Sequence, residues 1–302
     1  MAEQREILKP QDARKTYRYL RLGMIGAVVV LAASIVVEHR KVDCWQTSIS
    51  AYYYTPVRAI FVGSMMAVGL SLIVYKGRTA VEDISLNFAG MLAPLVAVAP
   101  TTDVGACWSV PPIPRPVTDD GSLAGWVVTN IENNVDALLI AGALGVIAAV
   151  VIAVVARLAR PAALEWRRGT IISLAITAGV LLAVWWLSRN WDDFDTRAHG
   201  YAAVGMFALL TFAIVAKIFE QQRDRKPAYL WTYLVIAVLM ILGGILIPVT
   251  RLFDDHTVFA LETFEITFFA VYWSVQTVEN WDEQVRPVAG DTPVNGCSSP
   301  PP

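Results

Sequence analysis

Residues 135–156 read VDALLIAGALGVIAAVVIAVVA, and this stretch decides the class of fold. Its only charged residue is Asp136, near its start. The hydrocarbon core of a bilayer is about 30 Å thick, and a helix that rises about 1.5 Å per residue needs about 20 mainly apolar residues to cross it. The stretch therefore predicts a membrane-spanning helix.

Similar apolar stretches occupy most of the remaining chain. They cover residues 19–37, 57–75, 84–98, 170–188, 201–218, 229–247 and 258–275. The composition agrees, because 56% of the residues are hydrophobic, 17% are charged and the mean hydropathy is +0.51. These values exclude a soluble domain of this length. The sequence predicts an all-α, polytopic transmembrane bundle of about eight spans, integral to the plasma membrane.

The basic residues alternate between the loops. If the N-terminus is cytoplasmic, the even-numbered connections and the two termini hold 17 of the 24 Lys and Arg residues, as the positive-inside rule requires. Both termini are therefore expected in the cytoplasm. The expected organisation is an N-terminal arm over 1–17, a bundle over 18–276 with an outer loop over 100–134, and a tail over 277–302 that is disordered from about residue 284. The basic residues flank spans, so no nucleic-acid partner is expected.

Two cysteines fall in the first two outer loops. An oxidising compartment permits a disulfide between Cys44 and Cys107, while Cys297 lies in the predicted inner tail. Two free thiols that never meet are the alternative, because sequence spacing alone does not establish disulfide geometry.

The segment 46–58, QTSISAYYYTPVR, is unusual for a loop. One interpretation makes its three tyrosines belt residues, which bury the ring at the lipid boundary and keep the hydroxyl in water. The other folds the segment into the outer mouth of the bundle, where Ser48, Ser50 and Arg58 line a pocket.

Two acidic residues, Glu262 and Glu265, lie inside the last apolar stretch, about one helical turn apart. Ionisable groups are costly in hydrocarbon and tend to mark function. In the structural interpretation, Glu262 pairs with Arg58 or Arg251 and Glu265 is hydrogen-bonded inside the bundle. The scarcity of further polar groups near mid-membrane argues against a transporter.

The three histidines, His39, His199 and His256, fall at the outer ends of predicted spans. Together with nearby aspartates they could form a catalytic zinc site. Such a site would resemble the membrane hydrolases of the alkaline ceramidase superfamily, although the motifs of those enzymes are not matched. The alternative treats these histidines as amphipathic boundary residues.

Three motifs resemble the DRAM-type family, the six-span damage-regulated autophagy modulators, and similar bacterial membrane proteins. They are SISAYYYTPVRAIFVG at 48–63, AHGYAAVGMFALL at 198–210 and FEITFFAVYWSVQTVENW at 264–281. The family's recurring residues would correspond to Ser48 and Ser50, to His199, and to Glu262 or Glu265. Relative to that pattern, the stretches 135–156 and 170–188 look like an inserted pair. The resemblance implies a membrane protein connected with lipid-related regulation.

The predicted role is to bind or organise membrane lipid at a polar pocket on the outer face, without a settled reaction or cofactor. A metal-dependent lipid hydrolase and a small-solute transporter are the alternatives, and the oligomeric state stays open. The candidate pocket consists of Ser48, Ser50, Tyr53, Arg58, His199, His256, Glu262 and Glu265.

Overall fold

The computed structural model describes residues 10–105, 107–111, 114–159, 168–224, 227–251 and 253–281. Within these ranges the regular structure is helical, apart from one isolated bridge between Val117 and Leu123. The elements are α1 (Pro10–Val42), η1 (Ser50–Tyr54), α2 (Arg58–Val74), α3 (Ala80–Val98), α4 (Gly125–Ala159), α5 (Arg168–Asn190), α6 (Phe194–Asp224), α7 (Pro227–Thr250), η2 (Asp254–His256) and α8 (Thr257–Glu279), where η marks a short 3-10 helix. The all-α prediction is confirmed.

Six of the described helices are long and apolar enough to cross a membrane, namely α1, α3, α4, α6, α7 and α8. The helix α2 is a shorter apolar helix of 17 residues. The length and composition of these helices indicate a multi-pass membrane protein. Eight crossings and the cytoplasmic position of both termini stay predictions.

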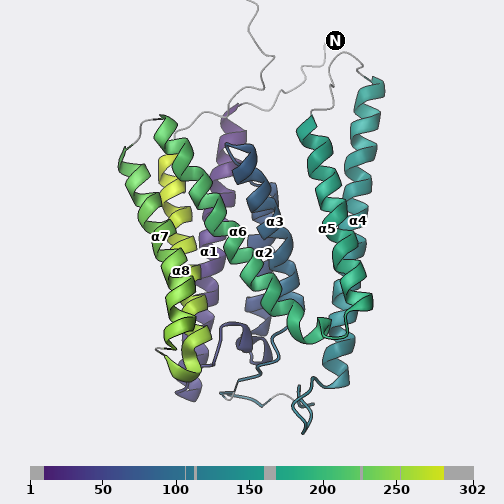
Figure 1. Cartoon of the computed structure of the whole chain (residues 1–302), viewed down its shortest axis with the longest axis vertical. Coiled ribbons are helices and arrows are strands. Elements are labelled where there is room, and N and C mark those ends of the chain that lie inside the picture. The colour runs from purple at the N-terminus through teal and green to yellow at the C-terminus, as the bar shows by residue number, and fades with distance from the viewer. Residues whose placement is uncertain are drawn as a thin grey trace, which may run out of the picture.

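Six helices form a closed ring. Each packs against the next in the order α1, α2, α3, α6, α7, α8 and back to α1. The helices α4 and α5 pack mainly against each other, and they stand together beside the ring in Figure 1. The two stretches that look inserted in the sequence therefore fold as a hairpin outside a six-helix core.

The backbones of α2 and α3 meet at a pair of glycines. A Cβ added to Gly69 would lie 2.8 Å from the carbonyl oxygen of Gly90, and one added to Gly90 would lie 2.6 Å from that of Gly69. Such close approach increases dispersion contact between helices, which is a main source of stability where lipid removes the hydrophobic driving force.

Two predicted boundaries differ from the structure. The outer loop predicted over 100–134 ends early, because α4 begins at Gly125. Its first turns bury Val127, Ile131 and Val135 at four-residue spacing, and this apolar stripe outweighs the polar Asn and Glu residues between them. At the N-terminus α1 begins at Pro10, inside the predicted arm, since proline suits the first turn of a helix. Residues 1–9 and 282–302, and with them the predicted disordered tail and Cys297, lie outside the described residues.

Candidate functional site

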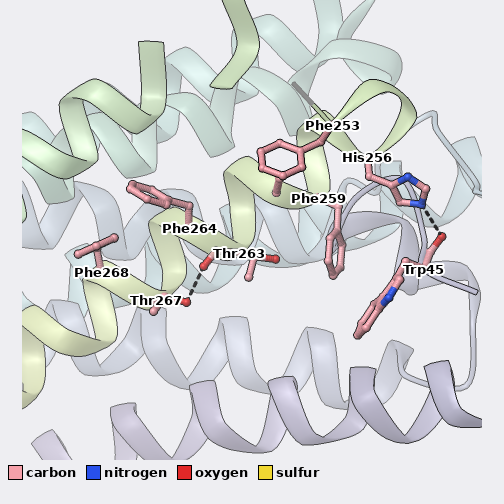
Figure 2. Close-up of a pocket in the computed structure, with 9 residues that line it drawn as sticks. Trp45, Phe253, His256, Phe259, Thr263, Phe264, Thr267 and Phe268 are labelled. Atoms are coloured by element: carbon pink, nitrogen blue, oxygen red, sulfur yellow. Dashed lines mark hydrogen bonds between the residues drawn. The ribbon is translucent and has the colours of Figure 1, made fainter. Parts of the chain in front are cut away.

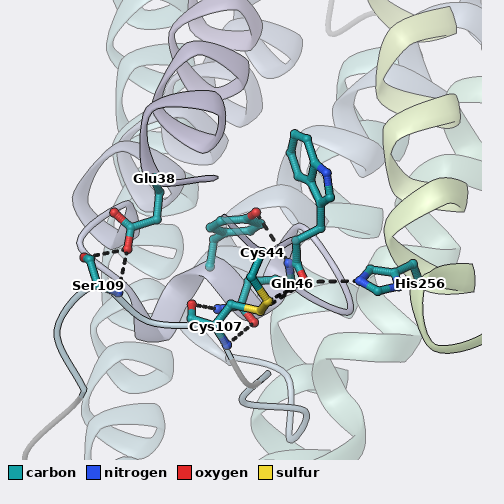
Figure 3. The surroundings of a disulfide bond; sticks show 8 residues. Glu38, Cys44, Gln46, Cys107, Ser109 and His256 are labelled. Carbon is teal, nitrogen blue, oxygen red and sulfur yellow. Dashed lines mark hydrogen bonds between the residues drawn. A yellow bond between two sulfur atoms is a disulfide. The ribbon is translucent and has the colours of Figure 1, made fainter. Parts of the chain in front are cut away.

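The first loop and the second loop of the predicted outer side are joined by a disulfide between Cys44 and Cys107, whose Cα atoms are 5.8 Å apart. Figure 3 shows the polar contacts around it. The side chain of Gln46 bonds both the backbone N–H and the carbonyl of Cys107, and Glu38 accepts hydrogen bonds from the backbone N–H and the hydroxyl of Ser109. These contacts close one end of the bundle, which is named the disulfide end below.

Glu262 fastens residues 48–50, Ser-Ile-Ser, to the last helix, and we name these residues the SIS segment. Its Oε2 accepts hydrogen bonds from the backbone N–H groups of Ile49, at 2.5 Å, and Ser50, at 3.3 Å, and its Oε1 accepts one from the Ser50 hydroxyl at 2.8 Å. The Ser48 hydroxyl accepts a bond from the N–H of Ala51 at 2.9 Å. The structure thus brings together three predicted pocket residues, Ser48, Ser50 and Glu262, at the start of η1.

The tyrosines of this segment are core residues. Tyr52, Tyr53 and Tyr54 are 1%, 3% and 7% exposed, so the belt interpretation is wrong for all three. The 3-10 helix η1 turns them inward, where Tyr54 donates a hydrogen bond to the carbonyl of Thr101 at 2.8 Å. Burial raises the pKa of Tyr54 well above its usual range, so its hydroxyl keeps its proton.

The predicted arginine pairs do not form around Glu262. Arg58 instead donates to the hydroxyl of Tyr53 at 2.5 Å and stacks its guanidinium 4.2 Å from the centre of that ring. Arg251 follows the end of α7, has a positive φ of 46° and is exposed. The sequence suggested an ion pair for Glu262. In the structure, its carboxylate instead accepts hydrogen bonds from backbone N–H groups.

The three histidines have separate roles. Nδ1 of His199 lies 2.8 Å from the carbonyl oxygen of Ala99, where α3 ends. Nε2 of His256 lies 3.1 Å from the carbonyl oxygen of Trp45, and the ring of His39 stacks on the Trp45 indole at 3.8 Å. Among the described residues, no three His, Cys, Asp or Glu side chains are grouped so that they could hold a metal ion. The zinc site stays a prediction.

A small internal cavity adjoins the Glu262 and Ser50 pair. Its volume is about 40 Å³, and apolar side chains from α1, α2, α3, α6 and α8 make up the rest of its wall. A cavity of this size has room for only a few water molecules. The polar mouth that the sequence predicts is therefore a largely filled contact rather than an open pocket.

An apolar groove of about 460 Å³ follows α8 on its flank (Figure 2). It begins at the disulfide end with Trp45 and His256 and continues down α8. Its lining residues are Trp45, Phe253, His256, Phe259, Ala260, Thr263, Phe264, Thr267 and Phe268. The Thr267 hydroxyl bonds the carbonyl of Thr263 at 2.7 Å, so it adds little polarity to the groove.

Of the predicted pocket residues, only His256 lines this groove. The aromatic lining residues Phe264 and Phe268 lie in the motif at 264–281, but their four-residue spacing is common to lipid-facing and core positions. Phe253 and Trp45 come from two other loops. The groove exists only because the fold brings these loops to the end of α8.

A second polar cluster lies at the opposite end of the bundle and is absent from the predicted site. It joins five helices and the connection between α2 and α3, and it contains three basic residues, three acidic residues and their polar partners. Its members are Arg21, Tyr75, Arg78, Glu82, Lys217, Glu220, Tyr233, Gln276 and Glu279. We refer to it as the inner ionic network, after the side of the membrane on which the sequence predicts it.

The inner ionic network is buried. Glu82 and Gln276 are 0% exposed and Lys217 is 1% exposed. Lys217 Nζ lies 3.0 Å from Glu220 Oε2 and 4.0 Å from Glu279 Oε2. Charged residues are thus buried in the bundle beyond Glu262 and Glu265, because Arg21 and Lys217 are 8% and 1% exposed.

Comparison of the chain with protein-family models, with curated proteins and with solved structures found no match. The resemblance to DRAM-type proteins therefore stays a prediction.

Proposed function

We propose that this multi-pass protein, placed in the plasma membrane, binds a membrane lipid by inserting one acyl chain into the groove along α8. The observation that carries the proposal is the groove itself, a concave apolar surface of about 460 Å³ on a helix long enough to span the membrane. Its volume is within the range of about 300–1,000 Å³ that is usual for small-molecule sites.

The dimensions of the groove fit one leaflet. From His256 to Phe268 the helix advances twelve residues, or about 18 Å at 1.5 Å per residue. Half of a hydrocarbon core is about 15 Å. A chain that enters at His256 would therefore reach the region of the bilayer centre at Phe268.

The surroundings of α8 determine which kind of molecule can occupy the groove. A groove that opens sideways from a membrane-spanning helix faces hydrocarbon, so the molecules that reach it are lipids. At its upper end, the Trp45 indole and the His256 imidazole have the amphipathic character of side chains at the headgroup level. Disulfides persist in oxidising compartments, which favours placing this end, and hence the bound lipid, in the outer leaflet.

A groove-filling substitution tests the proposal. Thr267→Trp places a large ring in the groove, and Thr232→Trp is its matched control. Thr232 lines a second apolar groove of about 370 Å³ at the other end of the α7 and α8 pair, and its hydroxyl likewise bonds the carbonyl four residues before it.

Delipidated protein is titrated with a synthetic diacyl phospholipid and followed by native mass spectrometry. The expected result is that Thr267→Trp weakens the tightest lipid adduct at least about 10-fold, a change of about 1.4 kcal/mol, while Thr232→Trp retains it. Equal retention by both variants would show that the tight lipid does not occupy this groove.

A further inference from the structure

Glu265 is a buried acidic residue inside α8. The residue is 4% exposed, and its Oε1 has no hydrogen-bond partner among the described residues. It lies eight residues after the start of α8, about 12 Å along the helix axis, and so well within the span. An isolated carboxylate is very costly to bury in hydrocarbon, and intramembrane acids therefore tend to mark functional sites.

The side chain of Glu265 faces a glycine pair in α7. A Cβ added to Gly244 would lie 3.6 Å from Glu265 Oε1, and one added to Gly243 would overlap the ring of Phe264. The absence of side chains at these two positions brings the backbone of α7 next to the carboxyl group. The nearest polar groups that α7 offers to Glu265 are therefore backbone carbonyls.

One of these carbonyls lacks its normal helical donor. In an α-helix the carbonyl of residue 244 bonds the N–H of residue 248, but that residue is Pro248, which has no N–H. The residue of α7 that faces Glu265 Oε1 thus carries a carbonyl group that its own helix does not bond in the normal way.

We propose that Glu265 and the Gly244 carbonyl form a proton-binding site inside the membrane. The Glu265 carboxylate takes up one proton from water, and the resulting O–H donates a hydrogen bond to the carbonyl oxygen of Gly244. Loss of the proton breaks this bond and leaves two acceptors facing each other. The contact between α7 and α8 is thereby linked to the protonation of one residue.

No other titratable group competes for this proton at close range. Glu262 is the nearest on α8, and its two oxygens are already occupied by the SIS segment. On the neighbouring helices, titratable side chains are absent between Tyr233 and Arg251 of α7, between Arg21 and Glu38 of α1 and between Tyr201 and Lys217 of α6. Protonation of Glu265 does not require a lipid in the groove. An experiment can therefore disprove the proton-binding site without disproving lipid binding, and the reverse also holds.

Infrared spectroscopy of the full chain in lipid nanodiscs tests the site, because a protonated carboxyl group has its own C=O stretching band. At neutral pH, Glu265→Gln should remove one such band, whereas Glu132→Gln, a substitution at an exposed acid on α4, should leave it. Pro248→Ala restores an N–H that recaptures the Gly244 carbonyl, so the band should shift to higher frequency as the acid loses its acceptor.

The matched control for Pro248→Ala is Pro94→Ala in α3. Pro94 also lies four residues after a glycine, Gly90. That glycine packs against α2 and not against an acidic side chain, so Pro94→Ala should not shift the carboxylic-acid band. The proposal is overturned if Glu265→Gln leaves the carboxylic-acid bands unchanged, or if Pro248→Ala does not shift them. If Glu265 instead gives a carboxylate band that moves when sodium is exchanged for choline, the site binds a metal cation and the proton-binding proposal is overturned.

Discussion

The hydroxyl of Ser50 donates a hydrogen bond to Glu262 across 2.8 Å and so joins the first loop to the last helix, 212 residues later in the chain. The same carboxylate also accepts the N–H of Ile49. It acts as an anionic cap for a short 3-10 helix, at the point where the ring of helices closes between α1 and α8.

Glu262→Gln should destabilise the fold by weakening this cap. Hydrogen bonds to a charged group contribute about 1.5–3 kcal/mol, and the amide of glutamine provides only one acceptor oxygen for three donors. The free energy of unfolding in detergent should fall by about 1–3 kcal/mol. Asp255→Asn, at an exposed acid in η2, should leave it unchanged, and equal effects of the two substitutions would contradict the capping role.

Lys217→Met should be more damaging. It removes a buried cation from between Glu220 and Glu279, and breaking a buried ion pair costs about 3–5 kcal/mol. Arg189→Ala is the control, because Arg189 and Asp136 are about half exposed and water screens the attraction between them. Thermal unfolding of the two variants should differ clearly, and similar midpoints would mean that water reaches the inner ionic network.

Gly69→Ala should loosen the contact between α2 and α3. Its new methyl group would clash with the backbone of Gly90, and overpacking of this kind costs about 1–3 kcal/mol. Gly63→Ala in the same helix meets no atom within 4 Å and should be neutral. The expected order of unfolding temperatures is wild type and Gly63→Ala together, with Gly69→Ala below them.

Reduction of the Cys44 and Cys107 bridge should lower stability by about 2–4 kcal/mol, because the bond closes a loop of 63 residues. Cys44→Ser with Cys107→Ser should show the same loss without reductant. If reductant lowers the melting temperature of the double variant as much as that of the wild type, the effect does not come from this disulfide.

The helical stretches were predictable because long apolar runs have few other stable forms. All eight described α-helices overlap the stretches that hydropathy predicts, and the hairpin of α4 and α5 corresponds to the pair that looked inserted. Their ends were less predictable, as α4 shows. The first part of α4 contains polar residues, which favoured a loop. Buried apolar residues at four-residue spacing nevertheless extend the helix into this segment.

The sites were harder to predict than the helices. Three tyrosines before a span have the composition of a membrane belt, and only the cap at Ser48 and Glu262 turns them inward. Lys217 lies at the end of a predicted span, where a lysine usually extends its amine to the lipid surface. Its burial depends on two acids, Glu220 on the same helix and a second acid on a different helix. Sequence spacing gives no information on the contact between the two helices.

The most direct test of the account is to map the contacts of a photoactivatable phosphatidylcholine that carries a diazirine in one acyl chain. The protein is reconstituted with this lipid, irradiated and digested, and the labelled peptides are identified by mass spectrometry. Labelling should concentrate on residues 256–268, and Thr267→Trp should remove it. Labelling spread evenly over the exposed apolar faces of α4 and α8, and unchanged by that substitution, would contradict the account.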